Sequence, residues 1–164
     1  MKAKKVAELG LLTAAAIILG WVEHMLPVVP SVPGIKLGLG NIAVMLTLYR
    51  MGGREAALVS AAKVLLSALM FGGFSGLIYS ASGALLSFVI MLILHKRPAF
   101  SPIGVSAAGG AAHVTAQVLA AMLLTMTPQL WTLIAPLLAV GTLTGALNGY
   151  LCSLLLSRMR AINE

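Results

Sequence analysis

The feature that most constrains this chain is a series of six apolar stretches separated by short polar interruptions. At about 1.5 Å of helix per residue and a hydrocarbon core of about 30 Å, most of the stretches are long enough to cross a bilayer. Only 9% of the 164 residues are charged and 60% are hydrophobic, whereas a soluble domain carries about 25% charged residues. The sequence therefore predicts an all-α integral membrane bundle that forms one transmembrane domain over residues 1–164.

Pro and Gly residues divide the chain into six predicted transmembrane helices. Pro27 ends the first helix, and the Pro- and Gly-rich segment from Pro27 to Gly40 is predicted to be an irregular loop. The next apolar piece is short, so either residues from Ile35 onward extend its helix or the loop dips into the membrane. The predicted helices cover residues 6–26, 36–51, 54–71, 76–94, 104–126 and 130–157.

The distribution of Lys and Arg predicts the orientation of the bundle. With six spans and the N-terminus inside, nine of the eleven basic residues fall on one side of the membrane. Short cytoplasmic loops retain Lys and Arg, so we expect a multi-pass protein of the cell membrane with both termini in the cytoplasm. The segments Pro27–Gly40, Gly72–Ser75 and Thr127–Gln129 are expected outside. This topology explains the net charge of +7, so nucleic acid is not expected as a partner.

The composition argues against most kinds of catalysis. The chain has no Asp and only four acidic residues, so carboxylate-held magnesium sites and paired-carboxylate catalysis are not expected. A single cysteine, Cys152, cannot form an internal disulfide or a cysteine-based zinc site. Neither a G-x-S-x-G turn nor a nucleotide-binding motif occurs. We expect no metal, no cofactor and no catalytic residue, and the sequence favours a protein that is not an enzyme.

Lys63 gives the strongest indication of a binding site, because an ammonium group near the middle of a bilayer costs free energy unless something compensates it. Counting residues from the predicted inner boundary places Lys63, His113 and Asn148 in one layer near the midplane. Gln117 lies one turn outward from His113 on the same helix face. Glu23 is predicted to lie well above Lys63 and therefore not to neutralise it. The alternatives are a snorkelling lysine and ordinary interhelical hydrogen bonds.

We predict that the polar residues of this layer line a ligand cavity that opens outward. Lys63 pairs with an acidic group of the solute, and His113, Gln117 and Asn148 orient it by hydrogen bonds. Asn41 and Lys36 are expected to close the site from above.

The two segments rich in glycine are predicted to form an outer lid over this cavity, because irregular backbone at a cavity is able to move. The alternative is that they are passive connectors. The residues assigned to the lid are Pro33, Gly34, Gly73, Phe74 and Ser75.

Two segments resemble a bacterial membrane family. They are Pro33 to Ile42, with the sequence PGIKLGLGNI, and Phe71 to Ser80, with the sequence FGGFSGLIYS. The family is labelled Gx transporter family or heptaprenyl diphosphate synthase component I, and the resemblance covers essentially the whole chain. Known polyprenyl diphosphate synthases are soluble enzymes with Asp-rich motifs, so a chain without Asp is not that catalyst by itself.

The family is also similar, in size and number of spans, to the S components of energy-coupling-factor transporters. Those proteins capture a vitamin-like solute and dock through a smooth first helix on a transmembrane subunit. The resemblance implies a docking contact at Ala3, Ala7, Gly10 and Ala14, with energising transmembrane and ATPase subunits as partners.

The function that the residues and the resemblance together predict is S-component-like binding of a small, anionic, vitamin- or cofactor-like solute for uptake. Two alternatives remain open at this point. One is a non-catalytic membrane subunit of isoprenoid or quinone metabolism, and the other is a structural subunit of a membrane complex.

Overall fold

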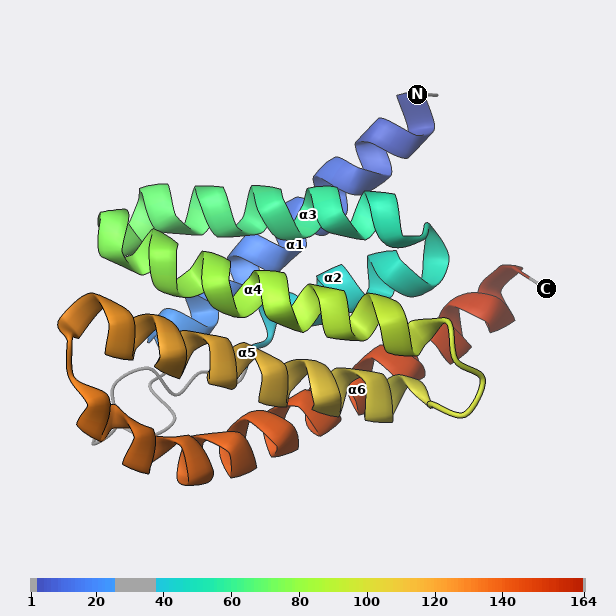
Figure 1. Ribbon diagram of the computed structural model, residues 1–164. Coiled ribbons are helices and arrows are strands. Elements are labelled where there is room, and N and C mark those ends of the chain that lie inside the picture. The colour runs from blue at the N-terminus through green and yellow to red at the C-terminus, as the bar shows by residue number, and fades with distance from the viewer. Residues whose placement is uncertain (1–2, 26–37, 164) are drawn as a thin grey trace.

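The computed structural model describes residues 3–25 and 38–163, which form an all-helical bundle (Figure 1). The six α-helices of this described part confirm the predicted fold class. They are α1 (Ala3–Met25), α2 (Gly40–Arg50), α3 (Gly53–Ser67), α4 (Gly73–His95), α5 (Pro102–Thr125) and α6 (Ile134–Asn163). A π-helical segment, η1 (Ala68–Gly72), joins α3 to α4, and a 3-10 helix, η2 (Pro128–Leu133), precedes α6.

Four helical segments of the described chain are long and apolar enough to cross a membrane. They are Ala3–Glu23, Gly76–His95, Pro102–Thr125 and Pro128–Met159. With 11 residues, α2 is only about 16 Å long, roughly half of a hydrocarbon core. The helix α3 has 15 residues and contains Arg54, Glu55 and Lys63. The described residues therefore indicate a multi-pass membrane protein with four candidate spans, and membrane crossing by α2 and α3 stays a prediction.

Two helix boundaries differ from the prediction because of the backbone conformation. The helix α2 begins at Gly40 and not at residue 36, because Gly38 has a φ of 70°, which is a left-handed conformation outside a right-handed helix. The chain reverses direction between α3 and α4, as predicted (Figure 1). However, the residues predicted as a non-helical turn, Gly72–Ser75, belong to η1 and α4, because hydrogen-bonded π-helical backbone leads directly into α4.

Residues at the helix ends explain two further boundaries. Ser101 caps α5 by accepting a hydrogen bond from the Gly104 N–H at 3.3 Å, and Pro102 occupies the first helical position, so α5 starts two residues earlier than predicted. Gly52, with a φ of 105°, makes the sharp connection from α2 to α3.

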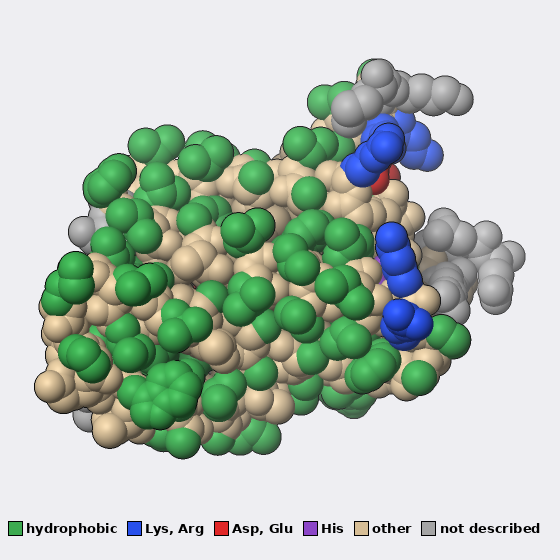
Figure 2. Space-filling model, in the orientation of Figure 1, with side chains coloured by type: hydrophobic (Ala, Val, Ile, Leu, Met, Phe, Trp, Pro, Cys, Tyr) green, Lys and Arg blue, Asp and Glu red, His purple; other side chains and the backbone are tan. Residues whose placement is uncertain are grey.

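Lys and Arg side chains gather at one end of the bundle, which we call the basic end (Figure 2). The helices α1 and α3 begin at this end, and α2, α4 and α6 finish there (Figure 1). Two ion pairs attach α1 to its neighbours at the basic end. Lys5 binds Glu55, and Arg50 Nη1 lies 3.0 Å from Glu8 Oε1.

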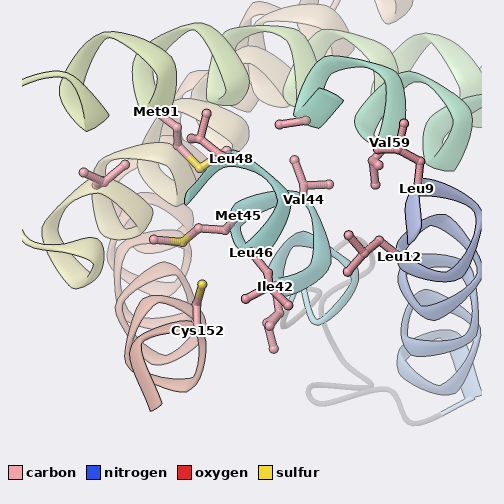
Figure 3. Packing of buried hydrophobic residues seen from close by; sticks show 12 residues of the cluster. Leu9, Leu12, Ile42, Val44, Met45, Leu46, Leu48, Val59, Met91 and Cys152 are labelled. Carbon is pink, nitrogen blue, oxygen red and sulfur yellow. The ribbon is translucent and has the colours of Figure 1, made fainter. Parts of the chain in front are cut away.

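The packed core surrounds α2 in the basic half of the bundle (Figure 3). Eight of the 11 residues of α2 are buried, and the Met45 and Leu48 side chains are each 1% exposed. Leu12 from α1, Val59 from α3 and Cys152 from α6 belong to the same cluster. Because α2 is less than half as long as α4 or α5, this core fills only part of the length of the bundle.

Candidate functional site

A cavity of about 540 Å³ lies beyond the N-terminus of α2 and extends along α4 and α5 to Met91 and Ser106, and Met91 also belongs to the packed core. Its wall contains residues of α1, α3, α4, α5 and α6, together with Leu130 and Leu133 of η2. Among the described residues in and next to α2, only Gly38 and Asn41 line it, so the N-terminus of α2 forms its floor. Small-molecule sites have volumes of about 300–1,000 Å³, so the space is large enough for a small solute.

Five of the six predicted ligand-binding residues line this cavity: Asn41, Lys63, His113, Gln117 and Asn148. Residues on four different helices therefore line one cavity. Asn41 lies at its floor, whereas we expected it to close the site from above. The sixth, Lys36, lies outside the described residues, as do Pro33 and Gly34 of the predicted lid. Binding of a ligand by these residues stays a prediction.

The second segment of the predicted lid, Gly73, Phe74 and Ser75, forms the first turn of α4. Phe74 is 78% exposed, and Gly76, which follows the segment, lines the cavity. The segment therefore lies beside the cavity, and its movement as a lid stays a prediction.

Lys63 is held at the floor of the cavity. Its Nζ donates a hydrogen bond to Asn41 Oδ1 at 2.6 Å, and the Asn41 N–H donates to the Gly38 carbonyl at 2.7 Å. Gly40 makes this approach possible, because a Cβ atom there would lie 2.9 Å from Lys63 Cε and 2.6 Å from the Ala16 carbonyl oxygen. The ammonium group thus reaches the N-terminus of α2, whereas a snorkelling lysine would extend toward the basic end.

Glu23 is the site residue that the sequence analysis missed. It is 8% exposed, lines the cavity and accepts hydrogen bonds from the backbone N–H groups of Gly38 and Leu39, the latter at 3.1 Å. A carboxylate in front of α2 also complements the positive end of the helix dipole. Glu23 and Lys63 both bind residues 38–41, so the two charges lie closer together than predicted. The signal that identified Lys63, a charge within an apolar stretch, applied equally to Glu23.

Asn148 connects α6 to the same turn. Its Nδ2 donates to the Gly38 carbonyl at 3.2 Å, and the residue is 4% exposed. Gly38 is suited to this position because its φ is positive and because a Cβ atom would lie only 3.3 Å from Asn148 Nδ2. The non-helical backbone before α2 is therefore enclosed by polar side chains from α1 and α6, which makes it tolerable at this depth.

His113 and Gln117 project from α5 toward Gly83 on α4. A Cβ atom at Gly83 would lie 2.7 Å from His113 Nε2 and 2.9 Å from Gln117 Cγ. Only a residue without a side chain leaves room for both groups at this point. Gly83 thus sets how closely the polar side chains of α5 approach α4.

The sequence matches the family model for heptaprenyl diphosphate synthase component I over residues 12–155, which is nearly the whole chain. The chain belongs to this family. The match confirms the family that the two motifs indicated, and the matched range includes every cavity residue named above. No curated protein and no solved structure matches the sequence. The similarity to S components therefore stays a prediction.

In this member of the component I family, the predicted docking residues lie on an exposed face of α1. They are Ala3, Ala7, Gly10 and Ala14. A Cβ atom at Gly10 would meet nothing within 4 Å, so the face is smooth and open. Within the described residues, no group of three or more His, Cys, Asp or Glu side chains is placed to hold a metal ion.

Proposed function

We propose that this component I family member is a substrate-binding membrane protein that holds a small solute in its cavity for uptake. The supporting observation is that Asn41, Lys63, His113, Gln117 and Asn148 line one cavity of about 540 Å³. Protein interiors are normally close-packed, and a large cavity with a few converging polar groups is typical of a ligand site.

The solute that suits this cavity is small and vitamin- or cofactor-like, with an acidic group directed at Lys63. An ammonium group has three N–H donors, so Lys63 is able to bind Asn41 and a solute anion together. Glu23 on the same wall repels a second negative charge, which favours a solute with one acidic group and hydrogen-bond donors elsewhere. The His113, Gln117 and Asn148 side chains then determine its orientation.

Solute that co-purifies with the protein tests the proposal. The protein is purified in mild detergent and denatured, and the small molecules released are identified by mass spectrometry. We expect a small acidic solute from the wild type and strong depletion in Lys63→Met. A matched control is Arg158→Gln, which removes an exposed charge at the basic end. Absence of any solute from the wild type, or equal amounts in both variants, would contradict the proposal.

The family description favours a second candidate, a non-catalytic membrane subunit of isoprenoid metabolism. The chain contains no Asp, so the carboxylate-held magnesium of a prenyl diphosphate synthase would come from another subunit. Release of a prenyl lipid from the wild type, in place of an acidic solute, would support this candidate.

We also propose that the basic end faces the cytoplasm, because Lys and Arg are retained on that side. Single cysteines are introduced at Gln129 and at Ser101, each in a protein that also carries Cys152→Ala. They test whether the two ends of the bundle lie on opposite sides of the membrane. A membrane-impermeant maleimide added to intact cells should label Gln129→Cys but not Ser101→Cys. Labelling of Ser101→Cys alone would reverse the orientation.

Uptake against a gradient needs energy, and we propose that separate energising transmembrane and ATPase subunits supply it. Their contact would be the exposed face of α1 that contains Ala3, Ala7, Gly10 and Ala14. Small residues allow close approach of a second helix within lipid.

A further inference from the structure

A second, smaller cavity of about 380 Å³ lies at the basic end. It is lined by Leu92, Ile93, Lys96 and Arg97, where α4 ends and the connection to α5 begins. Two of these side chains are cationic and two are apolar. We propose that this cavity binds the phosphate headgroup of an anionic phospholipid.

The charge balance of the basic end indicates an anionic occupant. Glu8 and Glu55 already pair with Arg50 and Lys5. Among the residues that the structure describes, neither Lys96 nor Arg97 forms an ion pair. Lys and Arg next to the end of a membrane span attract anionic lipid headgroups, whose phosphate is able to pair with both side chains.

An apolar stripe on α4 provides a path for an acyl chain. Leu85, Val89 and Ile93 follow one another at intervals of four residues and are 69%, 41% and 51% exposed. Residues four apart share a helix face, so the stripe extends over about 12 Å and ends at the cavity, where Ile93 is part of the wall.

The position of the stripe favours a lipid over a free phosphate ion. The helix α4 belongs to the candidate membrane span Gly76–His95, so its exposed apolar face lies at acyl-chain depth while Lys96 and Arg97 follow the end of the span. Leu92 packs against Gly53 of α3, where a Cβ atom would lie 2.6 Å from Leu92 Cδ1. Because Ile93 belongs to both the headgroup cavity and the stripe, the two form one continuous surface, which matches the shape of a phospholipid.

Native mass spectrometry of the full-length protein tests the site. The protein is mixed with equal amounts of phosphatidylglycerol and phosphatidylcholine in detergent micelles, and the retained lipids are counted. We expect the wild type to retain about tenfold more phosphatidylglycerol than phosphatidylcholine, because each Lys or Arg near the lipid surface contributes to binding of an anionic headgroup. The double variant Lys96→Gln/Arg97→Gln should lose this preference.

The matched control is Arg54→Gln/Arg158→Gln, which removes the same charge from two exposed residues outside the cavity. It should keep the preference for phosphatidylglycerol. Equal loss in both double variants would overturn the proposal in favour of general surface electrostatics. A third arm adds excess inorganic phosphate to the wild type, which should leave the lipid bound. Complete displacement would show that phosphate alone occupies the cavity, and would overturn the assignment to a lipid.

Discussion

The two halves of the bundle share their outer helices and differ at the centre. In the basic half, α2 fills the centre, and Met45, Thr47 and Leu48 are at most 1% exposed. In the other half, the centre is a cavity of about 540 Å³ whose floor is Asn41. The length of one short helix therefore decides where close packing ends and where a solute has room.

Two kinds of polar contact occur in the bundle. In the packed half, the Thr47 hydroxyl donates to the Ala43 carbonyl one turn earlier on its own helix, at 2.7 Å. At the cavity, Glu23, Lys63 and Asn148 bind backbone or side-chain atoms of a different element. The first kind of hydrogen bond pairs a side chain with the backbone of its own helix. The second kind connects different elements around the cavity.

The largest expected effect is on the packed half. Leu48→Ala should lower the free energy of unfolding by about 2–5 kcal/mol, because it opens a cavity in a close-packed core. Leu137→Ala shortens a side chain in the wall of the existing cavity and should lower the free energy of unfolding by clearly less. Unfolding of both variants in detergent micelles provides the measurement. Equal losses would mean that the two halves are packed alike.

Contacts between backbones hold α5 and α6 together beside the cavity. A Cβ atom at Gly110 would lie 2.1 Å from the Gly141 carbonyl oxygen. Gly110→Ala should therefore force the helices apart and destabilise the fold by about 1–3 kcal/mol, the usual range for overpacking. The same unfolding assay applies, and an unchanged midpoint would show that this half does not depend on close helix contact.

The sequence was sufficient to predict the membrane class, because long apolar stretches indicate membrane spans, and the family, because two motifs indicate it. It was not sufficient to predict where α2 begins or which groups Glu23 contacts. The sequence left open whether residues from Ile35 onward extend the short helix before Arg50, and the positive φ of Gly38 prevents that extension. The contact of Glu23 with Gly38 and Leu39 depends on how the chain returns from α1, which periodicity does not encode.

A smaller effect is expected at Gly83. Gly83→Ala should displace His113 and Gln117 and weaken solute binding by about 0.5–1.5 kcal/mol, the range for one hydrogen bond. Gly10→Ala is the matched control, because a Cβ atom there meets nothing within 4 Å and Gly10 does not line the cavity. Titration calorimetry with the co-purified solute compares them. Equal affinities for the two variants would remove His113 and Gln117 from the binding site.

The smallest effect is expected at the exposed face of α1. Gly10→Ala should change the free energy of unfolding by less than about 0.5 kcal/mol, because its surroundings are open. The bulkier Gly10→Leu should leave solute affinity intact but reduce co-purification of the energising subunits. Full retention of those subunits by Gly10→Leu would place their contact elsewhere.

Calorimetric titration of the co-purified solute into wild type and Lys63→Met tests the central claim most directly. This substitution keeps the length and apolar volume of the side chain and deletes its charge. The account predicts that binding weakens by about 1.5–3 kcal/mol, as for a lost charge-assisted hydrogen bond. The fold should keep or gain stability, because a half-buried charge within an apolar helix bundle is removed. Unchanged affinity in a folded Lys63→Met protein would contradict both the role of Lys63 and the acidic solute.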